Sequence, residues 1–278
     1  MDTPAVFDRL AGAVQESGAL ALKSQGTVKN EGKVKVGAAD DSERLKAMRS
    51  AKTVIDEQVQ EILLQALLEC YPDGAILVDG EEKTPSLTNF STSARTSVII
   101  DPIDGTLEYL EGTDAYSVCI AIIEDERLSW AIVYFPARDV AYAVAPDGKA
   151  YEYAGFSATG TAQAHVIELP ANGPRVLYKT RRVPPEFEQR FVDAGFEVRA
   201  LDNYVQGLLA TLTGDALGYI SCEPQMRDIL IGPVIGTSVG GFMCDWQGKE
   251  ISWPQSGRLK EAFFGNAALE AEFRELLK

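Results

Sequence analysis

The sequence predicts a mixed α/β protein, and three patterns along the chain support this fold class. The first seventy residues contain two stretches with apolar side chains at helical spacing. From about residue 115 to residue 144, short alternating runs separated by turns are typical of a meandering antiparallel sheet. After residue 157, strand-like and helix-like runs alternate, which is typical of an α/β arrangement.

The first half is expected to begin with two helices, at residues 5–22 and 43–69, joined by a Lys- and Gly-rich loop at 29–41. Apolar runs at 75–78 and 98–100 are too short for helices and predict buried strands. Residues 85–93 are polar and predict a loop. Further strands are expected at 115–123, 129–134 and 140–144.

The second half follows a segment at 153–161 that is rich in Gly, Ala, Ser and Thr. This composition shift divides the chain into residues 1–155, an α+β half, and residues 156–278, an α/β half. Strands are expected at 175–178, 197–201 and 218–221, and helices at 185–194, 203–212, 228–238 and 267–277.

The most informative motif is Asp-Pro-Ile-Asp-Gly-Thr at residues 101–106, directly after the apolar run Val98–Ile100. Two carboxylates at the end of a strand are hard oxygen ligands on a rigid element, which suits Mg²⁺. The Gly-Thr pair that follows offers N–H groups and a hydroxyl at a helix start, which suits a phosphate group. Asp, Pro and Gly also favour tight turns, so the motif alone leaves a purely structural turn open.

Other acidic residues stand where elements begin or end. Residues 79–82 read Asp-Gly-Glu-Glu after a predicted strand, Asp56 lies in a helical stretch, and Asp228 opens an apolar run that leads to Gly240 and Gly241. An isolated Asp at a helix start is usually an N-cap, so Asp56 and Asp228 indicate little by themselves. Carboxylates that converge at strand ends repel one another unless cations lie between them.

Taken in order, these motifs resemble the inositol monophosphatase superfamily, from about Asp56 to Trp246. The resemblance implies a layered αβαβα sandwich and a Mg²⁺-dependent, typically lithium-sensitive phosphomonoesterase that binds two or three ions. It also implies a homodimer.

The resemblance assigns residues position by position. Glu81, Asp101 and the Ile103 carbonyl would hold a first metal, and Asp101, Asp104 and Asp228 a second, with Asp101 bridging. Two such metals can clamp an in-line displacement of the phosphate.

The same resemblance assigns the residues around the reacting groups. Thr106 and Glu81 would position the attacking water, supported by Asp56, and the N–H groups of Gly105 and Thr106 would hold the phosphate.

The substrate wall departs from the family pattern. Arg227 stands where a Trp usually precedes the last metal Asp, and Ser221 falls where inositol phosphatases carry a substrate-binding Glu. Asn203 and Tyr204 lie in a loop that replaces the usual Gly and small hydroxyl residues. These three, Asn203, Tyr204 and Ser221, are the candidate substrate contacts.

Leu107-Glu108-Tyr109 after the central motif is more similar to the branch that removes the 3′-phosphate from adenosine 3′,5′-bisphosphate. Lys179, Arg181 and Arg182 could meet a second phosphate. A solvated turn after a strand is the interpretation we favour for these three residues.

Three functions therefore stay open. The first is a phosphatase of a small polyol or sugar phosphate, with inositol 1-phosphate as the generic substrate. The second is a 3′(2′),5′-bisphosphate nucleotidase. The third is a catalytically weak regulatory or binding protein that keeps the fold.

Composition excludes several other classes. The net charge is −15, which argues against a nucleic acid polymer as partner. No apolar run reaches the length of a membrane span, and the N-terminus lacks the pattern of a signal peptide, so we expect a cytoplasmic protein. The four cysteines are scattered without a Cys-x-x-Cys pair, which favours buried free thiols. The single histidine, His165, is expected at the surface or at a sheet edge.

Overall fold

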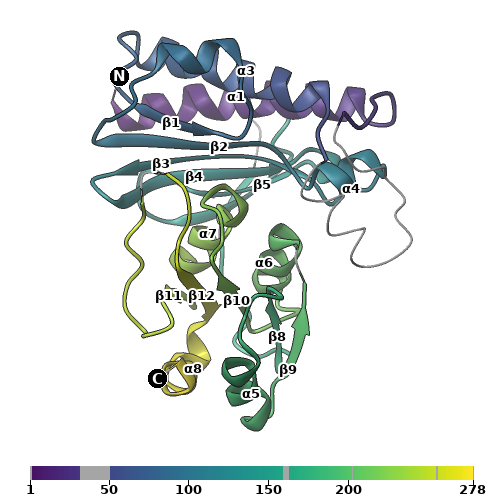
Figure 1. Cartoon of the computed structure of the whole chain (residues 1–278), viewed down its shortest axis with the longest axis vertical. Helices are drawn as coiled ribbons and strands as arrows, with labels where there is room; N and C mark the ends of the chain where they lie inside the picture. The colour runs from purple at the N-terminus through teal and green to yellow at the C-terminus, as the bar shows by residue number, and fades with distance from the viewer. Residues whose placement is uncertain (1, 32–50, 159–162, 202, 255, 278) are drawn as a thin grey trace.

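The fold is described from a computed structural model, which places residues 2–31, 51–158, 163–201, 203–254 and 256–277. It confirms the mixed α/β class and shows five layers (Figure 1). Helices α1 (Thr3–Ser24) and α3 (Val54–Cys70) cover the outer face of a first sheet. Helices α6 (Tyr204–Thr213) and α7 (Gly232–Thr237) lie between this sheet and a second one. The outer face of the second sheet carries α5 and α8 (Pro185–Asp193 and Glu270–Leu277).

The first sheet has the strand order β1-β2-β3-β4-β5-β6-β7. Only β1 and β2 pair in parallel, and the remaining neighbours are antiparallel, so most of this sheet is the predicted meander. The strands are Leu77–Gly80, Thr96–Asp104, Ser117–Glu124, Arg127–Phe135, Val140–Val144, Ala150–Ala154 and Gln163–Val166. The edge strand β7 is exposed throughout and carries His165, as the sequence predicts.

The second sheet has the order β11-β12-β10-β8-β9. Its strands are β8 (Val176–Lys179), β9 (Glu197–Ala200), β10 (Gly218–Cys222), β11 (Gly241–Cys244) and β12 (Glu261–Asn266). Strand β8 pairs in parallel with both β9 and β10, whereas β12 is antiparallel to β10 and β11. The parallel part corresponds to the predicted strand–helix alternation.

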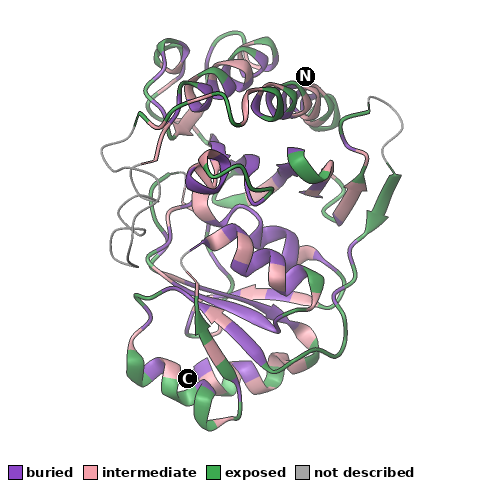
Figure 2. Ribbon diagram, turned by 90° about the vertical axis from the view of Figure 1, so that its right-hand side faces the viewer, coloured by how far each residue is buried: buried purple, intermediate pink, exposed green. Residues whose placement is uncertain are grey.

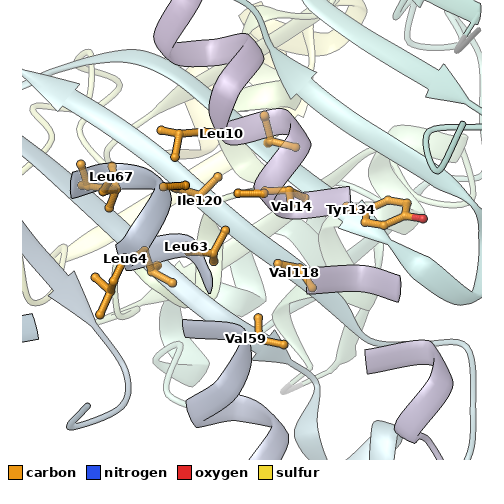
Figure 3. Packing of buried hydrophobic residues seen from close by; sticks show 14 of the residues in the cluster. Leu10, Val14, Val59, Leu63, Leu64, Leu67, Val118, Ile120 and Tyr134 are labelled. Carbon is orange, nitrogen blue, oxygen red and sulfur yellow. The ribbon is translucent and has the colours of Figure 1, made fainter. Parts of the chain in front are cut away.

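Three hydrophobic cores hold the five layers together, because the second core packs the middle helices against both sheets. Strand β2 contributes to two of these cores. Val98 and Ile100 join the core beneath α1 and α3, while Ile99 joins the core that packs against α6 and α7. This alternation follows from the two-residue period of a strand. Figure 3 shows the first core, in which Leu10 and Val14 meet Leu63 and Ile120. The third core fills the space between the second sheet and helices α5 and α8.

Burial follows the layers. The inner strands and the two middle helices are mostly buried, and exposed residues collect on the outer sides of the molecule (Figure 2). All four cysteines are free thiols, as predicted, and Cys70, Cys119 and Cys244 are buried. Among the described helices, none combines the length and apolar character that a bilayer crossing requires.

Several predicted boundaries were wrong. Helix α3 begins at Val54, because Thr53 has an extended backbone and caps the helix. The predicted helical residues 43–50, and residues 32–41 of the predicted loop, lie outside the described residues. The helix expected at 228–238 is interrupted, and α7 starts afresh at Gly232, with Pro233 near its N-terminus. Proline is tolerated in the first turn of a helix, because an N–H group there would have no carbonyl partner within the helix.

Other elements differ from the prediction in kind or number. Residues Pro85–Asn89, expected as a loop, form a short 3₁₀ helix, η1. Strands β6, β7, β11 and β12 were not predicted. Because β7 pairs with β6, the first sheet continues to Val166, past the residue where the composition shift divides the chain.

Candidate active site

One pocket of about 510 Å³ lies where β1 and β2 end and where the chain leaves β8 and β10. Its walls come from both halves of the sequence. Its described lining residues are Ala51, Glu81, Asp101, Ile103, Asp104, Gly105, Thr106, Leu107, Glu108, Thr180, Arg181, Arg182, Asn203, Tyr204, Gln225, Asp228 and Arg258. Four predicted acidic ligands are therefore brought together from segments up to 147 positions apart, from Glu81 to Asp228.

The central motif is shaped by an irregularity at the end of β2. The register between β2 and β3 shifts between Asp101 and Asp104, where Pro102 has no N–H to donate to the ladder. Gly105 then adopts φ 86°, and a Cβ atom there would lie 2.7 Å from the Ala115 carbonyl oxygen. Only glycine fits both conditions, so the turn into α4 (Thr106–Leu110) depends on it.

Asp101 is the most confined of these carboxylates. Its residue is 3% exposed, and its Oδ1 atom has no hydrogen-bond partner in the structure. Burial raises the pKa of Asp101 well above its usual value, and the charges of Glu81, Asp104 and Asp228 raise it further. A buried, unpartnered carboxylate oxygen among like charges is what a cation would stabilise.

The other carboxylates show the same mutual effect. Burial, Asp228 and Glu81 raise the pKa of Asp104 well above its usual value. Burial raises the pKa of Asp228 to about 6, even though Arg227, Arg258 and Arg182 pull it downward. The pKa of Glu81 is raised mainly by burial and is lowered in part by Arg227.

The donor chemistry of this set fits Mg²⁺, which prefers carboxylate and carbonyl oxygens. In the part of the chain that the structure describes, however, no three His, Cys, Asp or Glu side chains are already arranged as a metal-holding group. Glu81, Asp101, Asp104 and Asp228 share a pocket and perturb one another without forming a closed ligand shell. The ligand assignment stays a prediction.

Asp56 lies within hydrogen-bond distance of Thr106, and its supporting role in the reaction stays a prediction. The Thr106 hydroxyl lies 3.2 Å from Asp56 Oδ1 and 2.9 Å from the Ile103 carbonyl oxygen, and it can donate to either. The backbone N–H and hydroxyl of Thr53 both donate to Asp56 Oδ2, at 2.8 and 2.6 Å. Burial raises the pKa of Asp56 to about 6, against the effect of these two hydrogen bonds.

The Gly-Glu-Glu segment is fixed from α3 by a residue that sequence reasoning missed. The Gln60 side chain accepts a hydrogen bond from Glu82 N at 2.8 Å and donates to the Glu82 carbonyl oxygen at 2.6 Å. A Cβ atom on Gly80 would lie 2.7 Å from Gln60 Oε1, which explains the glycine. Lys52, also missed, makes an ion pair of 2.5 Å with Glu82. Glu81 is thereby oriented by its neighbours on both sides.

The second wall of the pocket is basic. Arg181 and Arg182 are exposed, as a solvated turn requires, but both line the pocket, so the favoured interpretation was incomplete. Lys179 is buried and pairs with Glu188 at 2.8 Å, and it is not among the described lining residues. Arg258, which sequence reasoning missed, also lines the pocket and donates to the Glu223 carbonyl oxygen at 2.9 Å.

Of the three candidate substrate contacts, two line the pocket and one does not. Asn203 and Tyr204 line the pocket, and the Asn203 side chain also caps α6 by accepting from Gln206 N at 2.9 Å. Ser221 is fully buried within β10, and its hydroxyl has no hydrogen-bond partner. It is not among the described residues that line the pocket, so the structure does not bring it to the other two.

The chain thus forms a layered αβαβα sandwich with an acidic pocket at its strand ends. The sequence profile of the inositol monophosphatase family matches residues 13–275, and the chain belongs to that family. Members of this family are phosphatases that generally depend on Mg²⁺ and act on small phosphate esters.

Relatives at low identity carry different names. A Nus factor SuhB of Pasteurella multocida is 26% identical over 78% of this chain and 80% of its own. An inositol monophosphatase 3 of Solanum lycopersicum is 24% identical over 87% and 92%. A 3′(2′),5′-bisphosphate nucleotidase CysQ of Escherichia coli is 24% identical over 78% and 86%.

Solved structures support the fold. An IMPase of Thermotoga maritima superposes with a TM-score of 0.68 at 20% identity and covers 96% of this chain and 94% of its own. An extragenic suppressor protein suhB of Bartonella henselae gives a TM-score of 0.70 at 17% identity and covers 99% and 98%. The predicted layered sandwich is thus confirmed.

Proposed function

We propose that this protein is a Mg²⁺-dependent phosphomonoesterase that hydrolyses a small phosphate ester. The observation that carries the proposal is the convergence of Glu81, Asp101, Asp104 and Asp228 on one pocket, with a buried Asp101 oxygen that lacks a partner. Mg²⁺, when bound, would supply positive charge to the phosphate oxygens and make a water more acidic.

The chain's own residues would orient the attacking water. When the Thr106 hydroxyl donates its proton to Asp56, its oxygen lone pairs are free to accept a hydrogen bond from that water. The Glu81 carboxylate would accept the second hydrogen bond. Gly105 and Thr106, at the start of α4, are the proposed phosphate contacts.

The direct test is phosphate release from a panel of substrates, with Mg²⁺ and with EDTA. The panel contains inositol 1-phosphate, adenosine 3′,5′-bisphosphate, fructose 1,6-bisphosphate and several sugar monophosphates. Release that requires Mg²⁺ supports the proposal. If no substrate releases phosphate, the third function, a regulatory or binding protein, replaces it, and the similarity to relatives named as Nus factors would then gain weight.

A second candidate function is favoured by the basic wall. Arg181, Arg182 and Arg258 line the same pocket as the carboxylates, and guanidinium groups bind phosphate strongly. A substrate with a second anionic group, such as adenosine 3′,5′-bisphosphate, would place one phosphate at the acidic set and the other at this wall. One relative is a nucleotidase of that type.

Kinetics of three variants distinguish the candidates. If a second phosphate meets the wall, Arg182→Gln and Arg258→Gln should each raise KM for the bisphosphate about tenfold, or ~1.4 kcal/mol, and change KM for monophosphates less than threefold. Equal effects on both substrates would contradict the second candidate. Tyr204→Ala tests stacking on adenine, because unchanged kcat/KM for the nucleotide would count against a role for this ring.

The other family expectations are proposals of the same kind. We propose two or three bound Mg²⁺ ions, lithium inhibition in the low millimolar range, a homodimer and a cytoplasmic location. Light scattering at several protein concentrations tests the dimer.

A further inference from the structure

Arg227 stands beside the acidic set and connects two segments that supply it. The residue opens the 3₁₀ helix η3 (Arg227–Ile229), directly before Asp228. Its Nε atom lies 3.9 Å from Glu81 Oε1, and its Nη1 atom lies 3.9 Å from Asp79 Oδ1. The Arg227 side chain is only 20% exposed, so solvent screens these two ion pairs less than pairs on the open surface.

The backbone holds η3 in this position. Gly257 N donates to Asp79 Oδ2 at 3.0 Å, and Met226 N donates to the Gly257 carbonyl oxygen at 2.9 Å. Asp79 therefore receives both the Gly257 N–H and the charge of Arg227. These contacts hold the start of η3 close to the end of β1, where Arg227 lies near Asp79 and Glu81.

We propose that Arg227 is a built-in counter-cation, which offsets the carboxylate charge in the metal-free protein and weakens the binding of Mg²⁺ to the same carboxylates. This inference rests on the proposed metal-dependent function. It deepens that function, because it assigns a position at which this chain departs from the Trp common in the family.

Two observations support a role in charge balance. The guanidinium of Arg227 lies 3.9 Å from carboxylate oxygens of both Asp79 and Glu81, and the residue directly precedes Asp228. The carboxylates are also not gathered into a metal-holding group in the described part of the chain. The Arg227 guanidinium offsets the negative charge of Glu81 from a distance of 3.9 Å. Mg²⁺, by contrast, requires oxygen ligands in a close octahedral arrangement.

The direction of the effect follows from the charges. Loss of one positive charge makes the local potential more negative, which favours a doubly charged ion twice as much as a proton at the same place. Even if Mg²⁺ must displace one proton from the carboxylates, removal of the guanidinium still leaves a net gain in Mg²⁺ affinity. The gain is largest at a pH of about 8, where fewer protons compete.

The test is calorimetric titration of Mg²⁺ into EDTA-treated, desalted protein at pH 8. We expect Arg227→Gln and Arg227→Trp each to bind Mg²⁺ at least about tenfold more tightly than the wild type, equivalent to ~1.4 kcal/mol. Arg227→Lys keeps the charge and should stay within about threefold. Arg9→Gln is the matched control, because Arg9 also pairs with a carboxylate, Glu69, but lies on α1. It should also stay within about threefold.

Thermal unfolding gives a second readout that does not depend on activity. In EDTA, both neutral variants should melt below the wild type, and saturating Mg²⁺ should reduce this difference. The Trp variant keeps the test available if the Gln variant does not fold.

The outcomes separate the two proposals. Equal or weaker Mg²⁺ affinity in a folded neutral variant would overturn the role of Arg227 while leaving the proposed function intact. Absence of Mg²⁺ binding by the wild type itself would overturn the metal site, and this inference with it.

Discussion

At the scale of single residues, Asp101 is a buried carboxylate that lies among three other carboxylates. Glu81, Asp104 and Asp228 all raise its pKa, and one of its oxygens is buried without a partner. Such an arrangement destabilises the metal-free fold, and proteins accept this kind of cost mainly at functional sites. The residue is therefore the most sensitive point at which to test the proposed chemistry.

We expect Asp101→Asn to abolish Mg²⁺-dependent phosphate release, because it removes the carboxylate charge that two metals would share. A loss below tenfold, ~1.4 kcal/mol in activation free energy, would show that the metal assignment is wrong. Asp193→Asn, at an exposed position on α5, is the matched control and should retain activity.

The residues of the site differ in how far sequence could reveal them. Asp101, Asp104 and Thr106 lie within one six-residue motif, so local spacing was enough to select them. Arg258 and Gln225 carry no local signal, because they reach the pocket through a bridge between segments 33 positions apart. The favoured turn interpretation of Arg182 described its exposure correctly but could not show what it faces.

At the scale of elements, the turn from β2 into α4 brings the Asp pair and Thr106 together. Gly105→Ala would place a Cβ atom 2.7 Å from the Ala115 carbonyl oxygen at a φ of 86°. We expect a loss of about 2–4 kcal/mol in the free energy of unfolding, since strained backbone costs roughly 1–3 kcal/mol and the collision adds to it. Denaturant unfolding at fixed pH measures this loss.

Gly112→Ala is the matched control for that substitution. Gly112 has φ 76°, and no neighbouring atom lies within 4 Å of the position that a Cβ would take. The variant therefore has the unfavourable backbone conformation but no steric clash. It should lose only about 1 kcal/mol. Equal losses in the two variants would show that the approach to Ala115 does not constrain the turn.

Elements whose apolar residues recur at helical spacing were predicted well. Short strands that depend on pairing with other segments of the chain were not. Helix α1 extends only two residues beyond its predicted range at each end. The four missed strands include β7, which has no buried residue, and β11, which has only four residues. The start of α3 had a local signal, because Thr53 and Asp56 form a capping box three residues apart.

At the scale of the whole molecule, the two halves meet at a pocket in which the chain's acidic excess is partly buried. The net charge is −15, but the acidic residues do not all affect stability equally. Exposed carboxylates are screened by solvent, whereas the buried carboxylates of the pocket are screened much less. The stability of the metal-free protein should therefore depend on pH through a few buried groups.

Asp56 allows that dependence to be measured, because it is not itself among the predicted metal ligands. Its pKa is raised from 3.8 to about 6 in the folded protein, so the folded state keeps a proton that the unfolded state releases between these values. Well below pH 3.8 both states are protonated, and the group has no effect on stability. The stability therefore falls as the pH rises from about 4 to about 6, and above the folded pKa the cost stays nearly constant.

We therefore expect the wild type to lose stability relative to Asp56→Asn as the pH rises from 4 to 7.5 in EDTA. The asparagine keeps an oxygen that can accept the Thr53 hydrogen bonds but cannot ionise. The difference in unfolding free energy should change by about 2–3 kcal/mol in favour of the variant, since each pKa unit corresponds to ~1.4 kcal/mol. Urea unfolding at several pH values checks this, and parallel pH profiles for the two proteins would contradict it. Because every other titrating group is common to both proteins, the difference isolates the one carboxylate that supports Thr106.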